Sequence, residues 1–126
     1  MFAYSERSKT HASHTMADDV PEDVKLRRLQ EVIDAFRETG EAASKSLIGS
    51  EHVVLVEGES KRSTKESPQM SGRNDNNKIC VWSPLNVPGP DGDTITPEKG
   101  TWLRVKVVNA GRNTLYVEPL RAQATL

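Results

Sequence analysis

The sequence predicts an α+β protein in which an N-terminal helical segment is followed by a small antiparallel β-barrel. Residues 21–39 place apolar side chains at helical spacing, and the stretch after residue 51 contains several short β-like runs separated by polar turns. The change between the two patterns falls in an Ala-, Ser- and Gly-rich segment, residues 41–50. We therefore expect two parts, residues 1–45 with the helix and residues 51–126 with the barrel.

Length and charge restrict the possible functions. A chain of 126 residues has room for one modest domain, or for a small domain with an appended element, which excludes a large two-domain enzyme. The formal net charge of −1 provides no long-range field for nucleic acid, so any such binding must be local. No apolar run approaches the ~20 residues of a membrane span, and the N-terminus lacks the apolar centre of a signal peptide. We expect a soluble protein.

The cysteine and histidine content predicts no metal site. Cys80 is the one cysteine of the sequence, so it cannot form an internal disulfide or hold zinc or an iron–sulfur cluster by itself. Its place in a strand-like run favours a packed or half-exposed thiol over a reactive one. The histidines His11, His14 and His52 do not combine with Cys, Asp or Glu at metal-ligand spacing, and we expect them at the surface.

The N-terminal segment begins with Phe2-Ala3-Tyr4-Ser5, an apolar and aromatic start typical of the end of a strand that enters a polar loop. A natural protein rarely starts inside such an element. We therefore expect the sequence to be part of a longer chain, with the partners of this strand missing.

A helix is predicted from Asp19 to about Thr39. Asp19 and Glu22 have the spacing of a capping box, Pro21 falls in the first turn, and Gly40 is a suitable stop. One face of the helix is expected to be buried, and it comprises Val24, Leu29, Val32, Ile33 and Phe36. The simplest interpretation is a packing helix without chemistry.

Four β-strands are predicted in the second part of the chain: Val53–Glu57, Lys78–Trp82, Trp102–Val108 and Leu115–Leu120. Polar turns rich in Asn, Asp, Gly and Pro separate them. Several short strands in fewer than 80 residues favour a small closed barrel, because closure leaves no long edge exposed.

The run Trp102–Val108 alternates, so its two faces can be assigned. Leu103, Val105 and Val107 are expected to point inward, and Trp102, Arg104 and Lys106 to point outward. An aromatic ring beside two cations is able to stack on an unpaired base and hold phosphates. The alternative is that the ring covers a neighbouring element and the cations keep the outer face soluble.

The stretch from Val53 to Arg73 joins an apolar strand to a polar, hydroxyl-rich loop with four cations, Lys61, Arg62, Lys65 and Arg73. Cations presented from a rigid strand are suited to a phosphate backbone. An ordinary solvated loop has the same composition, and the loop alone does not separate these interpretations. Arg73 has a further alternative, in which it braces the barrel through a carboxylate such as that of Glu57.

Two separated patterns resemble the MiaB-type tRNA methylthiotransferases. The first resembles the closing part of their radical-SAM domain and consists of Phe2-Ala3-Tyr4-Ser5-x-Arg7-x-x-Thr10-x-Ala12 and Val20-Pro21-Glu22-x-Val24-Lys25-x-x-Arg28-Leu29. The second resembles the TRAM domain that follows it and consists of Val54-Leu55-Val56-Glu57-Gly58, Ser60-Lys61-Arg62-Ser63, Gly72-Arg73-Asn74-Asp75 and Gly100 before a Val-rich strand. The wording Val-Glu-Gly-x-Ser-Lys-Arg-Ser is most similar to that of the eukaryotic, mitochondrial-type members. This resemblance implies an intracellular protein, mitochondrial or cytoplasmic.

The resemblance implies a TRAM barrel, which is OB-like, after a remnant of a radical-SAM barrel. It implies a parent transferase, a tRNA-2-methylthio-N6-dimethylallyladenosine synthase, that uses S-adenosylmethionine and [4Fe-4S] clusters bound by cysteines not present in these 126 residues. The fragment alone is not expected to be catalytic or to hold a cofactor. The resemblance assigns contact with the backbone of the tRNA anticodon arm to Lys61, Arg62 and Arg73. It places Tyr4, Ser5 and Arg7 near the cofactor or substrate of the full enzyme. The partners of this chain would then be the tRNA and the missing N-terminal and radical-SAM domains. Tyr116 departs from the family pattern, which commonly has a small residue there.

A competing hypothesis from another class is a protein-interaction module that docks through the amphipathic helix 21–39. A free-standing hydrolase or transferase is not indicated, because the sequence has no Ser–His–acid pattern, phosphate-cradling Gly-rich loop or metal-ligand spacing.

Overall fold

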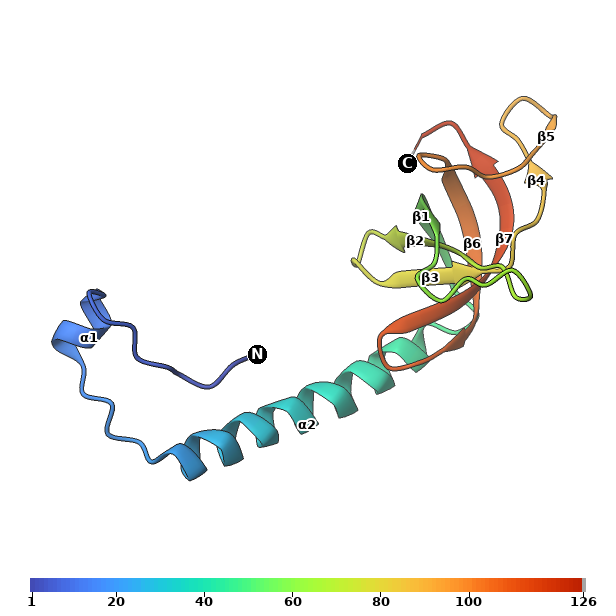
Figure 1. Cartoon of the computed structure of the whole chain (residues 1–126). Helices are drawn as coiled ribbons and strands as arrows, with labels where there is room; N and C mark the ends of the chain where they lie inside the picture. The colour runs from blue at the N-terminus through green and yellow to red at the C-terminus, as the bar shows by residue number, and fades with distance from the viewer. Residues whose placement is uncertain (126) are drawn as a thin grey trace. The chain divides into compact units, whose positions relative to one another are not determined.

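The computed structural model describes residues 1–125, which divide into two compact units, Met1–Thr39 and Gly40 onward. The first unit contains the short helix α1, His11–Thr15, and the greater part of helix α2, Glu22–Ser46. The second contains the end of α2 and all the strands (Figure 1). The predicted division into residues 1–45 and 51–126 stays a prediction, since contacts separate the chain earlier, within α2.

The predicted strand at the start of the chain is wrong. Residues 1–7 have no regular structure, and the chain then forms α1, which the sequence reasoning missed. Thr10 caps this helix, because its hydroxyl accepts a hydrogen bond from the Ser13 amide at 3.3 Å while the Thr10 amide donates to the Ser13 hydroxyl at 3.2 Å. A strand requires a paired neighbour, and no other strand lies in the described part of this unit.

Helix α2 begins at Glu22, so the predicted capping box of Asp19 and Glu22 is wrong. The carbonyl of Pro21 accepts the first helical hydrogen bond from the Lys25 amide at 3.0 Å. The residue before a proline is disfavoured in helical conformation, which prevents the helix from starting at Val20. Asp18 is tied to the first turn instead, because the Lys25 ammonium donates to its carboxylate at 2.7 Å.

The predicted stop at Gly40 is also wrong, because α2 continues to Ser46. The residues after Gly40 favour a helix: two are alanines, and Glu41 and Lys45 form an ion pair of 2.8 Å one turn apart. The chain reverses at Gly49, whose φ of +90° is a conformation that other residues rarely adopt. The amide of Gly49 then donates to the Val107 carbonyl at 2.8 Å, which joins this turn to the barrel.

The apolar face of α2 was predicted to be buried, and this prediction is wrong. Val24, Leu29 and Ile33 are half-buried, whereas Val32 is 55% and Phe36 is 56% exposed. Periodicity indicates which face is apolar, but burial requires a second element, and the described part of the first unit provides little packing against it.

Five strands close into a barrel in the order β1-β2-β3-β7-β6. Their bounds are Glu51–Glu59 for β1, Met70–Asn74 for β2, Ile79–Trp82 for β3, Trp102–Ala110 for β6 and Thr114–Gln123 for β7. The predicted α+β class with a small closed barrel is confirmed, and the four predicted strands are present. Strand β2 was missed, because Met-Ser-Gly-Arg-Asn has no apolar alternation.

The barrel is mixed, whereas the sequence reasoning predicted an antiparallel one. Four of the junctions are antiparallel, and β3 pairs with β7 in parallel. The reason is parity, since a closed ring of five strands cannot alternate direction at every junction. The connection from β3 to β6 contains β4, Val87–Pro88, and β5, Thr94–Ile95, which form a separate two-stranded sheet (Figure 1).

The core fills the interior of the barrel. The predicted alternation in β6 is confirmed, since Leu103, Val105 and Val107 are fully buried. They pack with inward residues of the other strands, Val54, Val56, Cys80, Trp82, Leu115 and Val117, and with Val87 of β4. The outer face of the barrel is therefore left to carry any binding function.

Candidate nucleic-acid interface

A row of side chains crosses the outer face of the barrel, and strand register places them. On β1, Leu55 lies opposite Trp102 of β6 on one side and opposite Arg73 of β2 on the other. Arg73 in turn lies opposite Ile79 of β3. Because outward residues of paired strands are neighbours, an aromatic ring, two aliphatic side chains and a guanidinium become adjacent. Arg73 thus belongs to a strand and not to the polar loop in which it was predicted.

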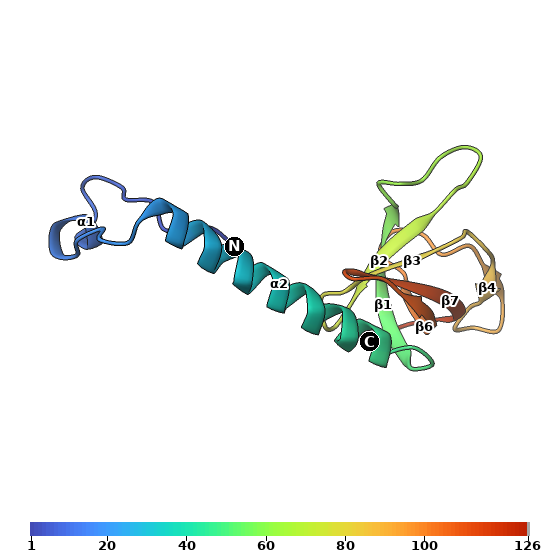
Figure 2. The same cartoon turned by 90° about the horizontal axis from the view of Figure 1, so that it is seen from below.

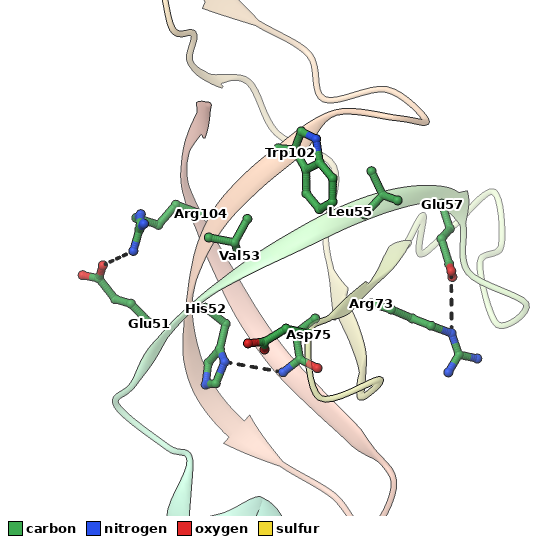
Figure 3. Close-up of a pocket in the computed structure, with 10 residues that line it drawn as sticks. Glu51, His52, Val53, Leu55, Glu57, Arg73, Asp75, Trp102 and Arg104 are labelled. Carbon is green, nitrogen blue, oxygen red and sulfur yellow. Dashed lines mark hydrogen bonds and ion pairs between the residues drawn. The ribbon is translucent and has the colours of Figure 1, made fainter. Parts of the chain in front are cut away.

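One end of this row lines a hollow of about 440 Å³, which we call the Trp102 hollow (Figure 3). Val53, Leu55 and Trp102 form an apolar surface, and the remaining lining residues are polar or charged: Glu51, His52, Glu57, Arg73, Asn74, Asp75 and Arg104. Arg104 Nη1 lies 3.5 Å from Glu51 Oε2. Arg104 Nε is buried without a hydrogen-bond partner, so this guanidinium is only partly satisfied.

The other end borders a second hollow of about 340 Å³, the Lys61 hollow. Its lining combines one residue of β1, residues of the loop between β1 and β2, and outward residues of β2, β3 and β7: Glu57, Ser60, Lys61, Arg62, Gln69, Ser71, Arg73, Ile79, Val81, Thr114 and Tyr116. Glu57 and Arg73 line both hollows. The structure therefore brings three of the predicted RNA-binding cations, Lys61, Arg62 and Arg73, to one place.

The loop that carries Lys61 and Arg62 is held by its own hydroxyl groups. The amide of Gln69 donates to the Ser63 hydroxyl at 3.0 Å, the amide of Ser67 donates to the Thr64 hydroxyl at 3.0 Å, and Ser60 and Gln69 join the loop ends through backbone groups at 2.8 Å. Figure 2 shows this connection, drawn in green, projecting beyond the ends of β1 and β2. The hydroxyls that made the loop look suited to phosphate therefore order the loop itself.

The two hollows differ in the balance of positive and negative side chains. The Trp102 hollow has three carboxylates against the two guanidiniums of Arg73 and Arg104. The Lys61 hollow has three cations against the single carboxylate of Glu57. Among the described residues, Lys61 and Arg62 form no ion pair. The Lys61 hollow is therefore the more positive of the two, and two of its three cations are not paired with a described carboxylate, an arrangement suited to an anion.

Arg73 has the bracing contacts that the sequence reasoning offered as an alternative. Its Nε lies 3.6 Å from Glu57 Oε1, and its Nη1 donates to the backbone carbonyl of Asn77 at 3.2 Å and to the Asn77 side-chain oxygen at 3.0 Å. The side chains of Arg73 and Glu57 are 42% and 50% exposed, so solvent screens the ion pair. Arg73 holds β2 to its turn and still presents part of its guanidinium at the surface.

The remaining predicted RNA-binding cations lie apart from this site. Lys65 is exposed in the loop and lines neither hollow. Lys106 is exposed on β6, where register places it opposite Glu51 of β1 and Glu118 of β7. The outward direction predicted for Trp102, Arg104 and Lys106 is confirmed, but the first two line the Trp102 hollow without Lys106.

The residues that the family resemblance placed near a cofactor, Tyr4, Ser5 and Arg7, are exposed in the irregular N-terminal segment. The Lys25 ammonium lies 5.5 Å from the centre of the Tyr4 ring, within cation–π range. The hydrogen bond from Lys25 to Asp18 raises the pKa of Lys25 above its ordinary value. Tyr4 thus packs against α2, and a cofactor role for the three residues stays a prediction.

Cys80 and His52 are placed as follows. Of the two predicted states of Cys80, packed or half-exposed, the structure has the packed one: Cys80 is fully buried, and burial raises the pKa of its thiol to about 12. His52 was predicted at the surface; it is half-buried and lines the Trp102 hollow, with Ser50 Oγ 2.8 Å from its Nε2. His11 and His14 are exposed.

Within residues 1–125, no three His, Cys, Asp or Glu side chains are grouped so as to hold a metal ion. None of the described helices combines the length and apolarity needed to cross a membrane.

Five apolar residues of the site were not predicted to belong to it: Val53, Leu55, Ile79, Val81 and Tyr116. Outward apolar residues look like core in a short continuous run, so the run 53–56 gave no sign that alternate members face outward. Tyr116 was noticed only as a departure from the family pattern. Strand β7 accommodates it readily, since Leu115 and Val117 face the core on either side.

Comparison with known proteins identifies relatives over nearly the whole chain. The chain is 44% identical over 117 residues to the mitochondrial tRNA methylthiotransferase CDK5RAP1 of Mus musculus and 41% identical to that of Homo sapiens, in each case over 91% of this chain and 19% of the relative. It is 38% identical over 120 residues to the tRNA-2-methylthio-N(6)-dimethylallyladenosine synthase of Christiangramia forsetii, over 95% of this chain and 22% of the relative. No protein-family model matches.

The chain spans about a fifth of the length of the curated relatives that it matches. Identity of 38–44% over 91–95% of the chain is far above the level at which similarity between unrelated proteins is expected. The match agrees with the two family-like patterns, which together extend from the N-terminal segment into the last strands. The chain is therefore a homologue of the C-terminal part of the MiaB-type tRNA methylthiotransferases, the group that includes the mitochondrial CDK5RAP1 proteins.

Proposed function

We propose that the barrel is a TRAM-type RNA-binding module that grips the anticodon arm of tRNA through its phosphates. The observation that carries the proposal is the Lys61 hollow, where three cations face one carboxylate on a rigid β support. The barrel provides that support because Arg73 is fixed on β2 and the loop of Lys61 and Arg62 is ordered by internal hydrogen bonds. Contacts of this kind position an RNA without reading its sequence.

The whole protein of which this chain forms part is, on this proposal, a mitochondrial radical-SAM tRNA methylthiotransferase that 2-methylthiolates N6-isopentenyladenosine next to the anticodon. Support comes from the relatives named above, whose names state tRNA methylthiotransferase or dimethylallyladenosine synthase activity. S-adenosylmethionine and [4Fe-4S] clusters would be bound by the other domains of the enzyme. Residues 1–45 would then be the end of the radical-SAM domain, with Tyr4, Ser5 and Arg7 beside its cofactor or substrate, and residues 51–126 the TRAM domain.

Local charge explains how a nearly neutral chain would bind RNA. With a net charge of −1, the protein does not attract a polyanion at long range, so binding must come from released counterions at a few phosphate contacts. Lys61 and Arg62 are suited to phosphate contacts because neither forms an ion pair with a described carboxylate. Arg73 has part of its guanidinium occupied by Glu57 and Asn77, and its contribution is expected to be smaller.

The test is a titration of a tRNA anticodon stem-loop by fluorescence anisotropy at several salt concentrations. The wild-type chain is expected to bind with an affinity that falls as salt rises. The double variant Lys61→Ala/Arg62→Ala removes two phosphate contacts, so its plot of log affinity against log salt should be shallower by about 1.5.

A matched control is the double variant Arg27→Ala/Arg37→Ala, which removes two exposed cations from α2 and changes the net charge equally. It is expected to keep the wild-type salt slope. The proposal is wrong if the wild-type chain shows no salt-sensitive binding, or if the Lys61 and Arg62 variant keeps the wild-type affinity and slope.

A second candidate function is a protein-interaction module that uses the amphipathic helix 21–39. The observation in its favour is the exposed apolar face of α2, where Leu26, Val32 and Phe36 are each more than half exposed. Such a face is costly to leave in water and is a common docking surface. Sedimentation combined with amide hydrogen exchange tests it, because a strictly monomeric chain with a well-protected α2 would argue against a missing partner.

A further inference from the structure

Tyr116 is the aromatic side chain of the Lys61 hollow. It lies on β7 between the inward residues Leu115 and Val117, so its ring points outward, and it is 41% exposed. Register places it opposite Val81 of β3. The same hollow is lined by Lys61 and Arg62. An exposed ring beside two cations that form no ion pair with a described residue is a combination that binds single-stranded nucleic acid, since the ring stacks on a base and the cations hold the phosphate.

The rest of the hollow suits a nucleoside. Ile79 is half-buried and Val81 is only 5% exposed although it faces outward, so they provide an apolar wall. Polar groups of Ser60, Gln69, Ser71 and Thr114 line the remaining surface. The volume of about 340 Å³ is near the lower limit of small-molecule sites, a size suited to a single nucleotide.

We propose that the Lys61 hollow holds one unpaired nucleotide of the bound RNA, with its base stacked on Tyr116 and its phosphate on Lys61 and Arg62. The proposal rests on the proposed RNA-binding function and adds to it the class of RNA structure that this site recognises. A base in a duplex is already stacked between its neighbours and cannot reach the ring. The site therefore favours a loop, a bulge or a single strand over a continuous helix, and it accepts any of the four bases because each has a π face.

The experiment compares two RNAs, a stem-loop and a fully paired duplex of equal length, with the 126-residue chain and its Tyr116→Ala, Tyr116→Phe and Val108→Ala variants. The Tyr116→Ala variant is expected to bind the stem-loop about 10-fold more weakly and the duplex unchanged. Tyr116→Phe keeps the ring and should keep the affinity. Val108 is 50% exposed on β6 and lines neither hollow, so Val108→Ala controls for the loss of an exposed apolar side chain.

A second measurement detects the stacking directly. A stem-loop with 2-aminopurine in its loop loses fluorescence when that base stacks, so the wild-type chain should quench it and Tyr116→Ala should not. The salt slope of Tyr116→Ala should equal that of the wild type, because the ring carries no charge.

The outcomes separate this inference from the proposed function. If the wild-type chain binds neither RNA in a salt-dependent way, both are wrong. If it binds with the expected salt slope but prefers the duplex, or if Tyr116→Ala binds the stem-loop as the wild type does, the inference about Tyr116 is wrong and the phosphate-binding function stands.

Discussion

Replacement of Gly72 by alanine is predicted to destabilise the barrel that supports the proposed site. It lies on β2, opposite Val56 of β1 and Cys80 of β3. A β-carbon built there would meet the backbone carbonyl oxygen of Leu55 at an impossible distance and would lie 2.6 Å from the Val54 side chain. The change Gly72→Ala therefore forces β1 and β2 apart at the centre of their pairing.

The cost can be judged from the nature of the obstacle. Overpacking a protein interior costs about 1–3 kcal/mol, and the upper half of that range applies here because a backbone carbonyl cannot move aside as a flexible side chain does. Urea unfolding of domains of this size has a slope of about 1–3 kcal/mol per molar, so the midpoint should fall by about 1 M with the slope unchanged.

Gly111→Ala is the matched control, because the nearest atoms to a β-carbon there are the Thr114 carbonyl oxygen at 3.7 Å and a Tyr116 ring carbon at 3.9 Å. These are ordinary contacts, and its free energy of unfolding should stay within about 0.5 kcal/mol of the wild type. A Gly72→Ala variant that unfolds at the same urea concentration as Gly111→Ala would show that the close approach of β1 and β2 does not constrain the barrel.

Three further predictions concern α2 and the core. Gly40→Ala should stabilise α2 by about 0.8–1 kcal/mol, because the position is inside the helix and open to a β-carbon; slower amide exchange in α2 would show it, and faster exchange would contradict it. Burial raises the pKa of the Cys80 thiol from 9.0 to about 12, so Cys80 should resist iodoacetamide at pH 8 until the chain unfolds, and rapid labelling of the native chain would contradict its burial. Because the thiol of the unfolded chain ionises first, the free energy of unfolding should decrease as pH rises from about 9 towards 12. Ser44→Ala removes the hydroxyl that accepts a hydrogen bond from the Lys78 ammonium at 2.9 Å and should lower the free energy of unfolding in urea by about 1.5–3 kcal/mol. The control Ser46→Ala removes a hydroxyl that bonds only within α2 and should lower it much less, and equal losses would argue against the bond between Lys78 and Ser44.

The fold was largely predictable because its signals are local. The alternation of residues 102–108 identified which side chains of β6 are buried, since faces alternate in any extended strand. Strand β2 was not predictable in the same way. Its central glycine is required by the approach of Leu55 from β1, a contact between segments 17 residues apart in sequence that no local pattern contains.

The candidate site was predictable in part. Lys61, Arg62 and Arg73 were found from their residue type and their place in the polar stretch, and the family resemblance assigned the same three to the tRNA backbone. Their grouping with Tyr116 was not found, because Tyr116 lies on the last strand and reaches this place only through the parallel pairing of β3 and β7. The sequence likewise gave no reason to separate Lys106 from Trp102 and Arg104.

By itself, the sequence determined the α+β class, the inward residues of strand β6 and the cluster of cations in the loop after β1 of a nearly neutral chain. Each of these depends only on the order of neighbouring residues. The tertiary structure alone decided which cations share a hollow and which are opposed by carboxylates. Charges act through distance in space, and closure of five strands into a ring brings Lys61 and Tyr116, which are 55 residues apart, to the same hollow while it places Lys106 opposite two glutamates.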